Sequence, residues 1–305
     1  MGETASYGLG WPGTGGADNY GAGAKERVSR PGRIGWGAVS EPFVAVVTGA
    51  SSGIGAATAR RLAREPAVRL VLVARREERL RRLAEELGGA TVVAVDLTAA
   101  DAPTLVCTAV EREHGRLDLL VNNAGAAWRA SFADGGWENV ERHMKLNFEA
   151  QVRLTEALLP LLRRTARQSS GRVAIVNVAS TAARVSRPRS GAYSASKFAL
   201  AGWSDALHAE ERPHGVHVGL VLPGFVATEG FPAAELCANP FTRRIVSRPE
   251  RVADAIIAAG PGGRPERYVP RAYWLAAALR ILAPGLVRRA TAGGAFTTAT
   301  ATRRE

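Results

Sequence analysis

The chain has little of what metal-centred, disulfide-stabilised or membrane-spanning proteins need. Its 305 residues contain two cysteines, Cys107 and Cys237, whose separation fits neither a metal spacing nor a disulfide framework. The five histidines include no His-Glu-x-x-His, and His208, His214 and His217 fit a solvated helix end better than a metal site. No apolar run reaches the eighteen or so residues of a membrane span, and no internal repeat is present. We therefore expect no metal.

Lysine is also scarce, because the chain has three lysines among its 40 basic residues. The net charge of +12 comes with no nucleic-acid-binding motif and no interleaving of aromatic and basic residues, so we expect no nucleic-acid partner. Half of this charge lies in residues 264–305, which hold eight arginines and two glutamates.

The two ends of the chain differ from its middle. Residues 1–40 hold eleven glycines and no apolar periodicity, which predicts a flexible tail, and they lack the architecture of a signal peptide. Residues 271–305 predict an apolar, basic C-terminal helix and tail. This segment either packs on the substrate cleft or another subunit, which we favour, or lies on an anionic membrane surface.

Apolar runs alternate with helical stretches between the two ends. Strands are expected near 43–48, 68–74, 91–95, 117–121, 172–178, 216–222 and 267–270. This alternation predicts an α/β protein, with residues 41–270 forming a single doubly wound Rossmann-type domain. Its parallel sheet should have about seven strands and helices on both faces.

A glycine-rich turn follows the first strand, as Thr48-Gly-Ala-Ser-Ser-Gly-Ile-Gly55. Gly49, Gly53 and Gly55 allow a tight turn and a close approach to a pyrophosphate, while the next helix offers its N-terminus to an anion. The spacing is G-x-x-x-G-x-G, which differs from the commoner dinucleotide fingerprint.

The most specific motif is Tyr193-Ser-Ala-Ser-Lys197, thirteen residues after Ser180. Five tyrosines and three lysines produce a Tyr-x-x-x-Lys by chance only about 0.05 times in this chain. On a helix the two side chains share one face, where we expect the ammonium to favour the phenolate and lower the tyrosine pKa.

These motifs stand in the order found in the short-chain dehydrogenase/reductase family, which the chain resembles over about residues 42–270. The other matching pieces are Asp96-Leu97, Asn122-Asn-Ala-Gly125, Asn147, Ser180 and Pro223-Gly224. The resemblance implies a catalytic set of Asn147, Ser180, Tyr193 and Lys197. It also implies a cytoplasmic enzyme that forms a homodimer or homotetramer.

The glycine turn and the resemblance together predict a cofactor site. It comprises Gly49, Ser51, Ser52, Gly53, Ile54, Gly55, Arg75, Arg76, Asp96, Leu97, Asn123, Ala124, Gly125, Tyr193, Lys197, Pro223, Gly224 and Thr228. Arg75-Arg76 stand after the second strand, where an acidic residue would favour NAD(H), so we expect NADP(H), with NAD(H) as the alternative. Asp96 fits either an adenine contact or the cap of a helix over 99–113.

The expected activity is hydride transfer between the cofactor and a ketone or secondary alcohol. Residues 225–248 should form an apolar lid, which favours a hydrophobic substrate. Arg184, Arg187 and Arg189 leave open an anionic substrate or an acyl carrier protein. The alternatives are therefore a 3-oxoacyl-(acyl carrier protein)-type reductase and a nucleotide-binding regulator without turnover.

Overall fold

Seven parallel strands form the centre of the fold, in the order β3-β2-β1-β4-β5-β6-β9. The computed structural model describes residues 42–65, 67–229 and 246–292. The strands are β1 (Phe43–Thr48), β2 (Val68–Ala74), β3 (Thr91–Ala94), β4 (Leu119–Asn122), β5 (Val173–Val178), β6 (Val216–Pro223) and β9 (Glu266–Val269). All seven expected strands are confirmed, to within two residues at each end.

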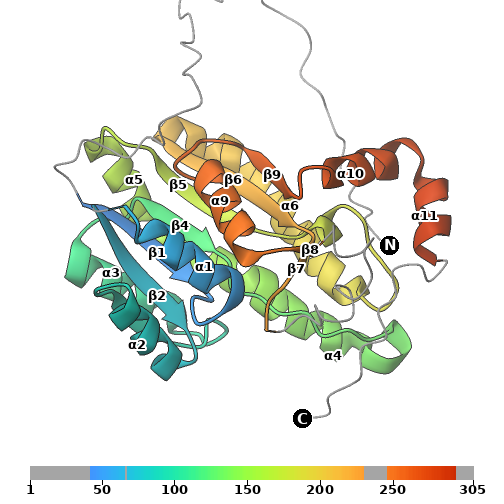
Figure 1. Cartoon of the computed structure of the whole chain (residues 1–305), viewed down its shortest axis with the longest axis horizontal. Helices are drawn as coiled ribbons and strands as arrows, with labels where there is room; N and C mark the ends of the chain where they lie inside the picture. Colours follow the sequence, from blue (N-terminus) through green and yellow to red (C-terminus); the bar gives the residue numbers. More distant parts are fainter. Residues whose placement is uncertain (1–41, 66, 230–245, 293–305) are drawn as a thin grey trace, which may run out of the picture. The chain divides into compact units, whose positions relative to one another are not determined.

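Helices cover both faces of this sheet, as Figure 1 shows. The α-helices of the described residues are α1 (Gly53–Leu62), α2 (Glu77–Glu86), α3 (Ala102–His114), α4 (Phe132–Met144), α5 (Ala150–Gln168), α6 (Gly191–Glu211), α9 (Pro249–Ala259), α10 (Tyr273–Leu282) and α11 (Pro284–Ala292), of which the last two lie beside the sheet. One apolar layer joins α1, α2 and α9 to the sheet, and another joins α3, α5 and α6 to its opposite face. The expected doubly wound architecture is therefore confirmed.

The apolar runs of the sequence explain the sheet. Every residue of β1 and β5 is buried, as expected of central strands covered on both faces. The chain builds β2 and β3 on one side of β1 and then returns to place β4 on the other. Ligands of such sheets bind beyond the carboxyl ends of the strands, where the order reverses. Here that point lies between β1 and β4.

Two local expectations are wrong. The helix expected over 99–113 begins at Ala102, with Asp101 as its N-cap, so Asp96 does not cap it. The histidine group was expected at a solvated helix end, but only His214 is exposed. His208 and His217 are partly buried, and each forms a hydrogen bond with a backbone carbonyl at 2.8 Å. Packing of α6 and β6 has enclosed the other two rings.

Parts of the expected ends and lid lie outside the described residues, namely 1–41, 230–245 and 293–305. The flexible tail and the domain boundaries at 40 and 270 stay predictions. The described ends of the lid form a short parallel ladder between β7 (Phe225–Val226) and β8 (Val246–Ser247). Of the helices in the described ranges, none has the length and apolar character needed to cross a membrane.

Candidate active site

The glycine turn between β1 and α1 is held by contacts that leave no room for side chains. Gly49 and Gly53 have φ angles of 65° and 53°, which favour glycine. A Cβ atom on Gly55 would lie 2.3 Å from the carbonyl oxygen of Gly49. The turn is tied to β4, because the Thr48 hydroxyl accepts hydrogen bonds from the backbone N–H of Asn123 at 2.8 Å and of Ala124 at 3.0 Å.

The N-terminus of α1 is arranged to receive an anion. Ser52 occupies the N-cap, yet its side chain makes no capping hydrogen bond. Instead, its hydroxyl accepts a bond from Arg76 Nη2 at 2.8 Å, and Arg76 also donates to Ser51 Oγ at 3.0 Å. The positive end of the helix and this guanidinium therefore face the same turn, which suits a phosphate.

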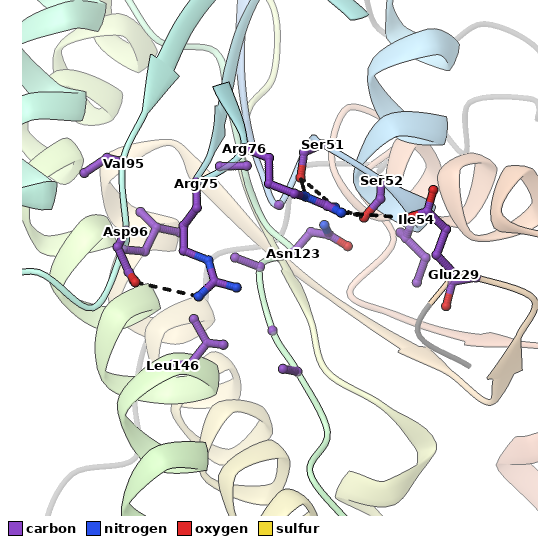
Figure 2. A pocket seen from close by; sticks show the side chains of 18 residues that line it. Ser51, Ser52, Ile54, Arg75, Arg76, Val95, Asp96, Asn123, Leu146 and Glu229 are labelled. Atoms are coloured by element: carbon purple, nitrogen blue, oxygen red, sulfur yellow. Dashed lines mark hydrogen bonds and ion pairs between the residues drawn. The ribbon is translucent and has the colours of Figure 1, made fainter. Parts of the chain in front are cut away.

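A cleft of about 350 Å³ opens beside this turn (Figure 2). Its lining includes 13 of the 18 expected cofactor residues: Gly49, Ser51, Ser52, Gly53, Ile54, Arg75, Arg76, Asp96, Leu97, Asn123, Ala124, Gly125 and Thr228. Gly55, Tyr193, Lys197, Pro223 and Gly224 do not line it. Gly55 packs on the Gly49 carbonyl within the turn, and the other four residues are described below.

Arg75 and Asp96 form an ion pair in the lining of the cleft, with Arg75 Nη1 3.8 Å from Asp96 Oδ2 (Figure 2). Asp96 Oδ1 accepts hydrogen bonds from the backbone N–H and the hydroxyl of Thr98 at 2.9 and 2.8 Å. Burial opposes ionisation here, but these bonds and the charges of Arg75 and Lys145 outweigh it and lower the Asp96 pKa. Asp96 is therefore an ionised acceptor at the edge of the cleft.

The side chain of Asn147 is positioned by an irregular helix. Residues 145–149 form a π-helical turn between α4 and α5, and such turns occur frequently at functional sites. The buried amide accepts a bond from Ala126 N at 2.9 Å and donates to Ala126 O and Ser196 Oγ, both at 3.0 Å. It thereby links the strand-end loop to α6, the helix that carries Tyr193 and Lys197.

Ser180 and Tyr193 come together as a hydrogen-bonded pair. Ser180 caps a 3₁₀ turn after β5, and its hydroxyl donates to the carbonyl of Pro223 at 3.3 Å. Burial raises the Tyr193 pKa, and the hydrogen bond with Ser180 and the charges of Arg187 and Arg129 oppose that rise. The hydroxyl therefore stays protonated at neutral pH and can donate to a carbonyl oxygen.

Lys197 is almost fully buried on the same helix, and its Nζ donates to the carbonyl of Val178 at 2.9 Å. Burial lowers its pKa from 10.5 to about 7. We expected Lys197 to lower the Tyr193 pKa, but the groups that do so are Ser180, Arg187 and Arg129. The lysine amine is directed instead toward the Val178 carbonyl.

Comparison with known proteins agrees with this geometry. Residues 43–235 match the family model described as short chain dehydrogenase. The chain belongs to this family. It is 33% identical over 195 residues to dehydrogenase/reductase SDR family member 7B of Danio rerio, a match that covers 61% of each chain. The chain thus spans about three fifths of that protein's length.

Solved structures support the same assignment. A short-chain dehydrogenase/reductase from Burkholderia phymatum in complex with NAD is 26% identical, with a TM-score of 0.70 over 81% of this chain and 95% of the other. L-sorbose reductase from Gluconobacter frateurii, complexed with NADPH and L-sorbose, is 28% identical, with a TM-score of 0.66 over 75% and 94%. Both cofactors occur among these neighbours.

Several residues of this short-chain dehydrogenase site were not expected from its sequence. Ala74, Val95, Ala126, Leu146 and Glu229 also line the cleft. The first four stand at strand ends or next to motif residues, so their position in the sequence could have indicated that they line the cleft. Glu229 reaches the cleft only through tertiary packing.

Gln151 and His143 hold the segment that follows β4. Gln151 Nε2 donates to the carbonyl of Ala124 at 2.7 Å. The buried His143 ring accepts a bond from Trp128 N at 3.0 Å, bonds Asn139 O at 2.7 Å, and lies edge-on to Tyr193 with a centroid distance of 6.0 Å. Because its neighbours come from separate turns, no sequence pattern marks this contact.

Proposed function

We propose that the chain is an NADP(H)-dependent oxidoreductase that transfers a hydride between the nicotinamide and a ketone or secondary alcohol, with a largely hydrophobic substrate. The observation that carries this proposal is the hydrogen-bonded pair of Ser180 and Tyr193, with Lys197 and Asn147 behind it at one end of the cleft. An intact set of this kind argues against a regulator that binds nucleotide without turnover.

A dinucleotide fits the residues that are present. The glycine turn brings backbone close to the cleft, and the first turn of α1 has no side-chain cap. We expect Arg75 and Arg76 to hold the 2′-phosphate that distinguishes NADP(H), because guanidinium groups bind phosphate strongly. Asp96 is suited to the adenine end. Thr228 is suited to the carboxamide, since it lines the cleft, where it packs close to Gly53.

When bound, the nicotinamide supplies or accepts the hydride. Tyr193 donates a proton to the carbonyl oxygen during reduction and removes it during oxidation. Ser180 holds the same oxygen in place, which restricts the substrate to a reactive orientation. Lys197 binds ribose hydroxyls, and Asn147 keeps α6 in register with the loop after β4. The Pro223 carbonyl holds the Ser180 hydroxyl, and Gly224 packs against the Tyr273 ring.

The test is a panel of ketones and alcohols followed by the absorbance of reduced nicotinamide, with NADPH and NADH compared. We expect turnover with NADPH and at least one apolar ketone. Including 3-oxoacyl thioesters tests the acyl carrier protein alternative in the same assay. Tight NADPH binding without turnover across the panel would favour the regulator.

The quaternary and cellular context belongs to the same proposal. Family resemblance supports a homodimer or homotetramer in the cytoplasm. The proposal includes a lipid contact through α10 and α11. Their exposed apolar side chains are Trp274, Leu275, Ile281, Leu282 and Leu286, and residues 271–292 contain four arginines and no acidic residue. Such a face suits peripheral contact with an anionic membrane surface.

A further inference from the structure

Three arginines in the segment between β5 and α6 have different surroundings. Arg184 pairs with Glu266 at 2.9 Å, and the exposed Arg189 pairs with Asp134 at 3.8 Å. Arg187 pairs with no carboxylate in the described ranges. Its guanidinium carbon instead lies 4.7 Å from the centre of the Phe225 ring. One of the three cations is therefore without a described counter-ion.

Arg187 stands at the substrate end of the cleft. Phe225, the ring beneath it, directly follows Pro223 and Gly224, and the Pro223 carbonyl accepts the hydrogen bond from Ser180. The Tyr273 ring from α10 packs on the same wall, because a Cβ atom on Gly224 would lie 2.3 Å from Tyr273 Cε2. The guanidinium thus lies over the segment that bonds Ser180, close enough for its charge to act on Tyr193.

The electrostatic surroundings of Arg187 are unfavourable in the protein alone. Burial and the charge of Arg129, from the loop after β4, lower the Arg187 pKa, whereas Tyr273 and Tyr193 oppose that change only weakly. The Tyr193 phenol stays neutral at pH 7, so it gives Arg187 no negative charge to pair with. Retaining a partly buried charge without a described carboxylate costs stability, so its retention points to a ligand that neutralises it.

We infer that Arg187 binds an oxyanion on the substrate, a carboxylate or a phosphate, and so selects anionic ketones and alcohols over neutral ones of the same size. Arg129 adds a second positive charge to this subsite. The inference rests on the proposed function and narrows its substrate class: an apolar body toward Phe225 and Tyr273, with an anionic end at the guanidinium. Cation stacking on Phe225 fixes the orientation of Arg187 in advance.

The experiment compares oxo acids with their methyl esters, at matched chain length, with NADPH as the reductant. Arg187→Met keeps an apolar stem over Phe225 and removes the charge. We expect the wild type to prefer the acids by kcat/KM, and Arg187→Met to lose roughly 10- to 100-fold on acids, as for a hydrogen bond to a charged group, but under about threefold on esters. Arg187→Lys should retain part of the preference.

Arg189→Gln is the matched control, because it removes a cation from the same segment that is exposed and paired with Asp134. Its ratio of acid to ester kcat/KM should stay within about twofold of the wild type. Calorimetry on the NADP complex gives a readout that needs no turnover. The wild type should bind a carboxylate more tightly than the corresponding amide. Arg187→Met should bind the carboxylate and the amide with the same weak affinity.

Two results would overturn the subsite. One is a wild type that binds and reduces acids no better than their neutral partners. The other is an Arg187→Met variant that loses activity equally on both substrates, with the alkaline limb of its pH profile displaced, which would make Arg187 a positioning residue for Tyr193. Failure of the proposed function looks different, because esters and acids alike would then show no hydride transfer while carboxylate binding could still depend on Arg187.

Discussion

At the nucleotide end of the cleft the shape is set by backbone, whereas at the substrate end it is set by side chains from separate segments. Gly55 and the Gly49 carbonyl pack at a distance that excludes any Cβ atom, and Thr48 ties the turn to β4. At the other end, Arg129, Arg187, Phe225 and Tyr273 come from four different parts of the chain.

This difference explains what each end can determine. Backbone geometry recognises what all dinucleotides share, a pyrophosphate, and needs only a short contiguous motif. Converging side chains recognise what differs between substrates, and each can change without disturbing the turn. Substitutions at the substrate end should therefore alter turnover and selectivity, and those at the nucleotide end should alter cofactor binding.

The largest effect that tests this separation is expected from Tyr193→Phe. The substitution deletes one hydroxyl and little contact area, so kcat should fall by roughly 10²- to 10⁴-fold, the contribution of a positioned acid or base. The dissociation constant for NADPH, measured by fluorescence titration, should stay near the wild-type value. Near-normal turnover would remove Tyr193 from the proposed chemistry.

The second prediction uses the buried amine of Lys197. Its pKa is about 7 in the folded protein and about 10.5 for an ordinary exposed lysine, as in the unfolded chain. Between these pH values the unfolded chain therefore binds more protons than the folded protein. The contribution of Lys197 to the free energy of unfolding therefore rises with pH across that window and is lowest below pH 7. Between pH 7 and 9, the free energy of unfolding of the wild type should gain about 2 to 3 kcal/mol relative to Lys197→Met.

Chemical denaturation of the cofactor-free proteins at both pH values measures this gain. Other groups titrate alike in the two proteins, so the difference isolates Lys197. If the free energy of unfolding depends on pH in the same way in the wild type and in Lys197→Met, the amine keeps its full charge inside the folded protein. In the holoenzyme, Lys197→Met should weaken NADPH binding as well as turnover, unlike Tyr193→Phe.

The same difference between the two ends decides how much could be predicted from the sequence. The strands, the glycine turn and Tyr193-x-x-x-Lys197 depend on local composition or short spacing, and the fold built from them is confirmed. Glu229, His143 and Tyr273 reach the site through tertiary packing, which no local pattern encodes. The wrong expectation for the Tyr193 pKa has the same origin, because burial by the folded chain raises this pKa and the lysine four residues away is not among the groups that lower it.

The third prediction concerns the nucleotide end. Arg75→Asp places a carboxylate where NADP(H) would carry its 2′-phosphate, so the ratio of kcat/KM for NADPH over NADH should fall roughly tenfold, about 1.4 kcal/mol. Arg81→Ala is the control, because Arg81 is an exposed residue that pairs with Glu77 on α2 outside the cleft. A wild type that already uses NADH more efficiently would contradict the proposed preference.

The smallest effect is expected from α10, whose two faces should separate cleanly. Tyr273 packs on Gly224 at the substrate wall, whereas Trp274 is 52% exposed on the outer face. Tyr273→Ala should raise KM for bulky substrates roughly threefold to tenfold, because it removes a wall contact worth up to about 1.4 kcal/mol, and should leave the NADPH dissociation constant unchanged.

Trp274→Ala should leave these kinetics unchanged and should weaken the salt-sensitive co-sedimentation of the protein with anionic vesicles. If the wild type binds no vesicles and Tyr273→Ala leaves KM unchanged, neither the cleft nor a membrane accounts for the apolar side chains of α10. Contact with another subunit then becomes their role. Analytical ultracentrifugation of a chain truncated after Pro270 would detect the loss of that contact.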